Sequence, residues 1–331
     1  MDRFEYLDFL KGIAIFFVVL GHTYMKCMGV QTLFLKFIID FNMPLWFLLS
    51  GFMAYKMCHR DIWISLKKKA VSLILPFITC GSVYALGYGE MHQYLYSEFH
   101  AGYWFLLSLF LCWLFLLPFL KLTNYIPDSR YKWGIELLVL LIPYWLLAVV
   151  GHFISSKFWI VSTLSMSNSY YRFVVLGFFL GRMICESDFK KKMLQHYNAI
   201  AAAITCCFVT IGVAISFLPY HDRWTSVLPM TFIQILLCIS VMGVAMFYRS
   251  HMHKLRKAIE SVGRNSLVIY CFHYFIIYHI HISLDSSWIE LTEGVYFFIA
   301  SFWAVLIIVL TLILAMPFNY NKYLRFTCWR N

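Results

Sequence analysis

Long apolar stretches dominate the chain, and short polar segments separate them. Runs of about twenty apolar residues have the length that a helix needs to cross a hydrocarbon layer roughly 30 Å thick. The pattern predicts an all-α, polytopic membrane protein with about ten transmembrane helices, in which residues 1–331 form a single transmembrane domain. The expected helices cover residues 9–30, 37–55, 70–88, 103–120, 133–151, 170–185, 198–217, 227–248, 265–283 and 294–316.

Composition and charge agree with a membrane protein. Hydrophobic residues make up 62% of the chain and charged residues 13%, whereas soluble proteins carry about 25% charged residues. The net charge of +11 would suggest a nucleic-acid partner in a soluble domain, but the positive-inside rule explains it more simply. With both termini cytoplasmic, 22 of the 27 lysines and arginines fall on the inner side. We therefore expect a multi-pass protein of the plasma membrane that contacts lipid and no nucleic acid.

Neither a cleaved leader nor a cysteine framework is predicted. The first apolar run follows a segment of mixed charge and precedes no small-x-small cleavage site, so we expect it to remain as the first span. Six of the ten cysteines lie in apolar runs, and no CxxC or Cys/His metal spacing occurs in the sequence. The cysteines are expected to pack as small apolar residues, with no metal bound. A compact chain of this kind suits the bacterial inner membrane.

The first predicted helix carries a polar stripe that contains Asp8, Lys11 and His22. Eleven residues separate Lys11 from His22, which at about 100° per residue is within roughly 20° of a whole number of turns, so both side chains face the same way. The rise between them is about 16 Å, or half of the hydrocarbon layer. An imidazole near mid-bilayer is costly unless it is paired or used, so His22 is the first candidate for a functional residue.

The ninth predicted span carries a second polar stripe. Ser266, Tyr270 and His273 follow an i, i+4, i+7 spacing and share one helix face. This helix is expected to run in the same direction as the first, so His273 and His22 should lie at a similar depth.

Polar groups also mark the second and third spans. Asp40, Asn42 and Pro44 open the second span from the outside, and Ser50 lies near its inner end. A basic run, Lys67, Lys68 and Lys69, precedes the third span on the cytoplasmic side. This run either sets topology and contacts anionic lipids, or it forms a rim that binds phosphate.

On the outer side, residues 90–104 combine acidic groups and histidines with aromatic rings that include Trp104. Such rings form interfacial belts, but they also stack on sugars beside hydrogen-bonding groups, and the sequence leaves both readings open. Arg172 lies near the outer end of the sixth predicted span, where it either snorkels to the interface or lines a site.

A buried histidine with cationic residues on the predicted inner side and polar residues on the predicted outer side suits acyl transfer from a cytoplasmic acyl-CoA. Lysines would bind the donor's phosphates, and a neutral imidazole would accept the proton of an incoming hydroxyl. The alternative from another class is a transporter or flippase for lipid-linked sugars, in which the same buried groups would serve proton coupling or substrate passage.

The residues resemble the acyltransferase-3 family of integral membrane acyltransferases. The family's signature is an Arg in an LDxLRG-like context, ten residues and then a His, which YLDFLKG followed by VVLGH matches with Lys11 in the Arg position. Similar segments follow in order: MPLWFLLSGF at 43–52, YWFLLSLF at 103–110, LGFFLG at 176–181 and GRNSLVIYCFH at 263–273. Two positions depart from the family pattern: Lys11 cannot form the bidentate fork of an arginine, and the basic R-x-x-R motif appears as Lys69-Ala-Val-Ser72.

The resemblance implies about ten membrane helices and transfer of an acetyl group from acetyl-CoA, used as a substrate with no permanently bound cofactor, to a cell-surface glycan or its lipid-linked precursor. It makes His22 the catalytic histidine, as general base or acyl-relay group. We expect Lys11, Lys67, Lys68 and Lys69 to bind the donor. His273, Trp104 and Arg172 should face the acceptor side, with direct transfer to its hydroxyl as the simplest mechanism. The residues expected to support or orient these groups are Asp8, Ser50, Ser266, Tyr270 and His273.

Overall fold

The computed structural model describes seven stretches of the chain, and all of their regular structure is helical. No strand occurs among these residues. The described stretches are residues 5–55, 61–129, 131–153, 159–186, 227–251, 253–282 and 293–320. The chain divides into two compact units, Met1–Trp46 with Asp188–Pro317 and Phe47–Ser187 with Phe318–Asn331.

The first unit is built on helix α1 (Glu5–His22), which continues as a π-helical segment, Thr23–Met28. Gly29 ends this segment in the left-handed conformation, with φ at 64°, which costs glycine little because it has no Cβ. The backbone N–H of Ile282 donates to the carbonyl oxygen of Cys27 at 2.8 Å and so joins the chain after α13 to the π-helical segment. The other helices that contribute to this unit are α2 (Leu33–Tyr55, its first half), α11 (Val227–His251), α12 (His253–Arg264), α13 (Ser266–Ile277) and α14 (Glu293–Tyr320).

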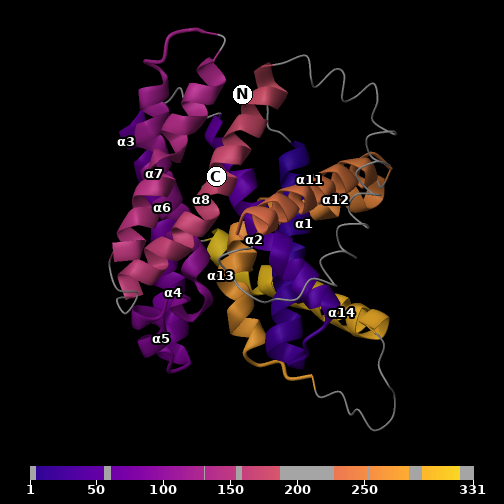
Figure 1. Cartoon of the computed structure of the whole chain (residues 1–331). Helices are drawn as coiled ribbons and strands as arrows, with labels where there is room; N and C mark the ends of the chain where they lie inside the picture. The colour runs from indigo at the N-terminus through magenta and orange to yellow at the C-terminus, as the bar shows by residue number, and fades with distance from the viewer. Residues whose placement is uncertain are drawn as a thin grey trace. The chain divides into compact units, whose positions relative to one another are not determined.

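Two glycines let α1 and α12 approach until their backbones touch (Figure 1). A Cβ on Gly263 would lie 1.7 Å from the carbonyl oxygen of Asp8, and one on Gly12 would lie 2.2 Å from that of Ile259. Small residues at such crossings allow helices to pack closely in membranes. The glycine of the GRNS segment is therefore a packing residue that fixes α12 against the charged end of α1.

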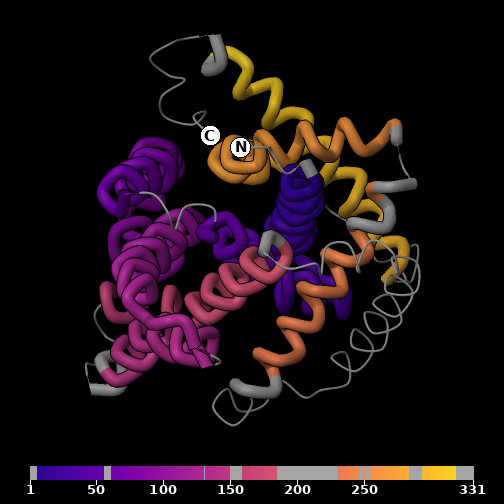
Figure 2. The backbone as a smooth tube through the Cα atoms, turned by 90° about the horizontal axis from the view of Figure 1, so that it is seen from above, coloured from indigo at the N-terminus to yellow at the C-terminus, as the bar shows by residue number. Residues whose placement is uncertain are grey.

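The second unit contains the last part of α2, from Phe47, and the helices that follow it to residue 187. A continuous helical run is formed by α3 (Ile62–Lys69), a π-helical segment (Ala70–Ile74) and α4 (Leu75–Gly87). Then come α5 (Met91–Tyr96), a 3₁₀ turn (His100–Gly102), α6 (Trp104–Thr123), α7 (Lys132–Phe153) and α8 (Trp159–Glu186). The last three helices contact one another, and Figure 2 shows them side by side in purple to pink.

Close packing also joins α2 to α8. A Cβ on Gly51 would meet the carbonyl oxygen of Val174 at 1.9 Å, and one on Gly177 would meet that of Leu48 at 2.0 Å. The glycines of two sequence segments, MPLWFLLSGF and LGFFLG, thus face each other's helix.

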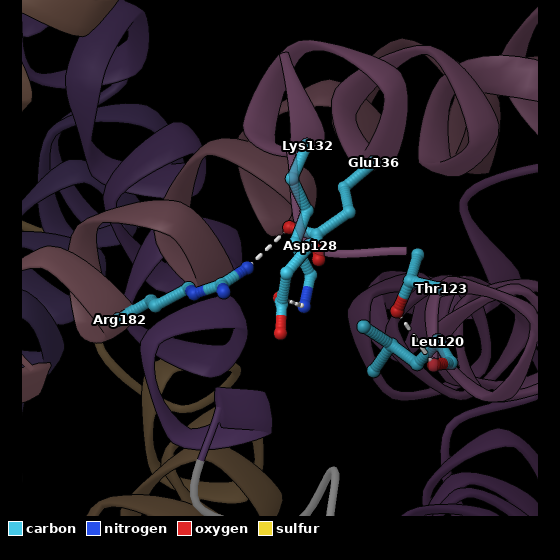
Figure 3. A network of polar contacts seen from close by, with 6 residues as sticks. All are labelled: Leu120, Thr123, Asp128, Lys132, Glu136 and Arg182. Atoms are coloured by element: carbon cyan, nitrogen blue, oxygen red, sulfur yellow. Dashed lines mark hydrogen bonds and ion pairs between the residues drawn. The ribbon is translucent and has the colours of Figure 1, made fainter. Parts of the chain in front are cut away.

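A buried ion pair joins α7 and α8 at one end of this unit. Arg182 on α8 donates to Glu136 on α7 (Figure 3). The guanidinium also lies over the Trp133 ring, 4.9 Å from its centroid. Lys132 pairs with Asp128 just before α7 and lowers the pKa of that carboxyl, chiefly by hydrogen bonding. These contacts hold the start of α7 on α8.

Six of the described helical runs are long and apolar enough to cross a membrane, and they correspond to six of the ten predicted spans. The six runs are Tyr6–Met28, Leu33–Tyr55, Ile62–Gly87, Trp104–Thr123, Lys132–Val149 and Glu293–Pro317. The predicted spans at 227–248 and 265–283 appear as shorter apolar helices, Met230–Ala245 and Ser266–Ile277. The span predicted at 198–217 lies outside the described residues.

The predicted start of the sixth span at residue 170 was wrong, because α8 begins at Trp159. Serine and threonine break the apolar pattern over residues 159–169, but their hydroxyls bond to carbonyls three or four residues earlier within the helix. Thr163 donates to Trp159 at 2.9 Å, and Ser167 donates to Thr163 at 2.8 Å. Arg172 therefore lies in the middle of α8 and not near its outer end.

Candidate active site

His22 occupies a helical irregularity in the first unit. It is the last residue of α1 and directly precedes the π-helical segment. Such segments widen the helix by one residue per turn and occur frequently at functional sites. Thr23, the next residue, is buried, and its hydroxyl donates a hydrogen bond to the carbonyl oxygen of Val19 at 2.9 Å. The half-buried imidazole is thus carried by a backbone that other contacts hold in place.

One hydrogen bond and two ring contacts surround the His22 imidazole. Its Nε2 lies 3.0 Å from the hydroxyl oxygen of Tyr274 on α13. The ring centroids of His22 and His273 are 5.3 Å apart, and those of His22 and Tyr274 are 4.9 Å apart. The expectation that the two histidines lie at a similar depth therefore holds. Among the described residues, Nδ1 of His22 has no hydrogen-bond partner, although the atom is buried.

His273 is fully buried, and its backbone neighbours fix its protonated nitrogen. Nδ1 lies 3.0 Å from the carbonyl oxygen of Ile269 and 2.7 Å from that of Tyr270. Because a carbonyl can only accept, Nδ1 carries the hydrogen atom and the neutral ring presents a lone pair at Nε2. That nitrogen is also buried without a hydrogen-bond partner in the described part of the chain.

The other predicted residues of the first unit lie along the same two helices. Ser266 and Tyr270 are buried on α13, with Tyr270 beside the His273 ring at a centroid distance of 5.7 Å. Asp8 is buried and Lys11 half-buried on α1, at the glycine crossing with α12. The stripe read from the sequence therefore runs from the α12 crossing to the histidine pair.

Two polar residues of α2, noted in the sequence for opening the second span, are buried in the first unit. Asp40 and Asn42 each have one side-chain oxygen without a hydrogen-bond partner among the described residues. The Asn42 side chain lies near Gly21, the residue before His22, since a Cβ built on Gly21 would be 4.0 Å from Asn42 Nδ2. An unsatisfied amide oxygen thus lies on the helix next to the one that carries His22.

In the second unit, Lys69 and Ser50 meet at a tryptophan. The Lys69 ammonium lies 3.9 Å from the Trp113 ring centroid, and the indole N–H donates to the hydroxyl of Ser50 at 2.9 Å. Lys69 is the last residue before a π-helical segment, as His22 is. Lys67 and Lys68 are exposed. Within the described part of the chain, Lys69 is therefore the predicted lysine whose ammonium is held by an aromatic ring.

The predicted acceptor-side residues, Trp104 and Arg172, lie beside an aromatic stack. The Trp104 ring is 5.5 Å from that of Tyr170, which in turn stacks on Phe47 at 4.7 Å and 10°. Arg172 is two residues from Tyr170 on α8, lies over the Phe173 ring, and has a buried Nε without a partner in the described stretches. Trp104 and the Arg172 segment therefore belong to one cluster of rings.

His100, in the predicted outer loop, serves the fold. It is 2% exposed, with Nδ1 donating to the carbonyl oxygen of Tyr94 at 2.8 Å and Nε2 lying 3.2 Å from the Thr163 hydroxyl oxygen. Burial lowers the pKa of the imidazole, although the bond to Tyr94 opposes the shift. His100 and Ala101 both have left-handed φ values of 45° and 50°. The buried ring holds this turn against the start of α8.

Sequence reasoning did not find two residues of these clusters, Tyr274 and Trp113. Tyr274 falls one position off the stripe of Ser266, Tyr270 and His273. Trp113 lies in an apolar run, where a tryptophan does not by itself indicate a function. The position of Tyr274 directly after His273 was the one signal in the sequence that it could belong to the site. Their roles depend on which helices pack together, which the helical period does not specify.

These observations define a membrane protein whose described residues form helices, in which the first helix brings His22 beside the buried His273. The part of the chain that the structure describes contains no group of three His, Cys, Asp or Glu residues that could hold a metal ion. The family model described as an acyltransferase domain matches residues 4–318 and spans both compact units. The chain belongs to the acyltransferase-3 family, and membership indicates membrane acyltransferase activity. Comparisons with curated proteins and with solved structures gave no match.

Proposed function

We propose that the protein transfers an acetyl group from cytoplasmic acetyl-CoA to a hydroxyl group of a cell-surface or exported glycan, or of its lipid-linked precursor. The observation that carries the proposal is the His22 imidazole, placed on a membrane helix with a buried ring nitrogen that no described residue engages. Family membership supplies the reaction class. We place the enzyme in the bacterial inner membrane.

In the proposed reaction, His22 acts as general base. The acceptor oxygen bonds to the thioester carbonyl carbon as His22 takes the hydroxyl proton, and the carbon–sulfur bond breaks. The proton then passes to the departing CoA thiolate, which leaves an acetyl ester and free CoA. Neither a metal ion nor a bound cofactor is needed for this balance.

Cationic residues are proposed to hold the donor. Lys11, at the α12 end of α1, and the run Lys67, Lys68 and Lys69 would contact the phosphates of CoA. The ammonium of Lys69 is already positioned by the Trp113 ring, which reduces the entropy lost when a phosphate binds. On the acceptor side, His273, Trp104 and Arg172 are the residues we propose to meet the sugar.

The decisive experiment uses purified protein, radiolabelled acetyl-CoA and cell glycans. We expect His22→Ala to lower label incorporation by at least about 100-fold, the size of a typical general-base contribution. His279→Ala is the matched control, because His279 is exposed beyond the end of α13. Unchanged incorporation by His22→Ala would remove His22 from the mechanism, and a wild-type protein that never binds CoA would favour sugar transport.

The same assay tests the donor role of Lys11. We expect Lys11→Arg to keep most of the activity, and Lys11→Gln to raise the KM for acetyl-CoA roughly tenfold through loss of a charge-assisted contact. A Gln variant with the wild-type KM would show that Lys11 does not bind the donor.

A further inference from the structure

We infer that Tyr274 is a positioning residue that fixes the tautomer of His22, so that Nδ1 is the ring atom that accepts the substrate proton. The inference rests on the proposed function, because it assigns atoms within the base that the proposal names. Its starting point is the 3.0 Å contact between the Tyr274 hydroxyl oxygen and His22 Nε2.

The contact admits two arrangements of hydrogen atoms. A neutral imidazole carries one hydrogen atom on its two nitrogens, so one ring nitrogen donates and the other accepts. If the Tyr274 hydroxyl donated to Nε2, the hydrogen atom of His22 would lie on Nδ1, where no described residue can accept it. If Nε2 donates to the Tyr274 oxygen, Nδ1 retains only a lone pair. In folded proteins a buried N–H without an acceptor is rarer than an acceptor with an unused lone pair, so the second arrangement is favoured.

The assignment leaves His22 ready to act as a base. Nδ1 is the atom that an acceptor hydroxyl must reach, because it carries the lone pair. The hydrogen bond from Nε2–H to Tyr274 keeps the ring from turning Nδ1 away from that hydroxyl. After proton transfer the imidazolium donates from both nitrogens, and the Tyr274 oxygen still accepts from Nε2–H. Tyr274 thus stabilises the charged form without exchanging a proton itself.

His273 contributes a second fixed ring beside the first. Its Nδ1–H is held by two backbone carbonyls, so its lone pair also lies at the nitrogen, Nε2, for which the described residues offer no partner. Its ring centroid is 4.3 Å from that of Tyr274, and the contact restricts the tyrosine ring. The hydroxyl of Tyr274 is therefore held at a defined place relative to His22.

The test combines kinetics with ¹⁵N NMR of protein labelled at its histidines. We expect Tyr274→Phe to lower kcat roughly tenfold, as the loss of one hydrogen bond predicts, with the KM for acetyl-CoA changed less than about twofold. Tyr278→Phe is the matched control, since Tyr278 is exposed at the end of the same helix. In the wild-type spectrum, neutral His22, assigned with the help of His22→Asn, should appear as the Nε2–H tautomer. In Tyr274→Phe, the Nδ1–H form should gain population.

Two results would overturn the inference: a wild-type His22 with its hydrogen atom on Nδ1, or a Tyr274→Phe variant with the wild-type kcat. The spectrum of the wild-type protein needs no variant at Tyr274, so the tautomer is testable even if that variant does not fold. An inactive His22→Ala beside an unaffected Tyr274→Phe would refute this inference alone. Full activity of His22→Ala would instead refute the proposed base.

Discussion

At the scale of single residues, hydrogen-bond partners and not burial distinguish the buried histidines of this protein. His100 and His273 are both buried, but among the described residues His100 has a partner at each ring nitrogen whereas His273 has partners at Nδ1 only. An unsatisfied buried polar atom costs about 1–3 kcal/mol, so a protein that keeps one has a reason beyond stability. By this criterion His22 and His273 are the residues to test for chemistry, and His100 is the residue to test for stability.

We expect the stability that His100 provides to depend on pH. Burial holds its pKa below the ordinary value of 6.5, so the unfolded chain binds the proton more readily. Stability is therefore lost as the pH falls through that value. His100→Asn suits the left-handed backbone and does not titrate near neutrality. At about pH 7.5 it should be less stable than wild type by about 1–2 kcal/mol.

Thermal unfolding in detergent, followed from about pH 7.5 to about pH 5.5, measures this effect. The difference between wild type and His100→Asn should shrink as the pH falls, because only the wild type carries the protonation penalty. A constant difference over that range would show that the histidine titrates alike in the folded and unfolded states.

The α1–α12 and α2–α8 crossings of this protein lie at glycines, which have no side chain to keep the helices apart. At the crossing of α1 and α12 the backbone of each helix lies against a glycine of the other, and α2 and α8 repeat the arrangement in the second unit. This geometry places the Asp8 and Lys11 end of α1 against a basic helix. That helix contains Glu260, whose pKa is lowered although burial alone would raise it, because Arg256 and Arg249 both donate to its carboxylate.

Gly263→Ala should disrupt the α1–α12 crossing. Its Cβ would lie 1.7 Å from a backbone oxygen, which no side-chain movement can relieve, so we expect a loss of at least about 2 kcal/mol. Gly134→Ala in α7 is the control: outside the adjoining backbone of its own helix, no described heavy atom lies within 4 Å of the added Cβ, and alanine favours a helix over glycine by about 0.5–1 kcal/mol.

Thermal unfolding of both variants measures these effects. The glycine contacts would be unimportant for stability if Gly263→Ala unfolded at the wild-type temperature. A control that was equally destabilised would point instead to a general intolerance of substitution.

For the molecule as a whole, the distribution of charge predicts orientation. The inner side is assigned from the lysines and arginines that surround the short connections. This places the connection between α6 and α7 in the cytoplasm and α5 outside. His92 on α5 and Asp128 before α7 are both exposed, and they lie at opposite ends of α6 along the chain.

Cysteine labelling of intact cells tests this orientation. In a background with the native cysteines replaced by alanine, His92→Cys should react with a membrane-impermeant maleimide. Asp128→Cys should react only after permeabilisation. The reverse pattern would invert the topology and place the donor lysines on the wrong side for cytoplasmic acetyl-CoA.

The sequence by itself determined the helical membrane class, the family and the stripe from Asp8 to His22. Apolar length, charge bias and helical period are properties of a segment and its neighbours along the chain, so they can be read without coordinates. The apolar pattern misplaced the start of α8, because serine and threonine residues interrupt an apolar run even when their hydroxyls bond within the helix.

Only the tertiary structure decided which side chains meet. Tyr274 bonds His22, Trp113 links Lys69 to Ser50, and glycines select the helix crossings. These partners are separated by many residues along the chain. Their meeting depends on how helices pack in three dimensions, which the period of any one helix does not encode.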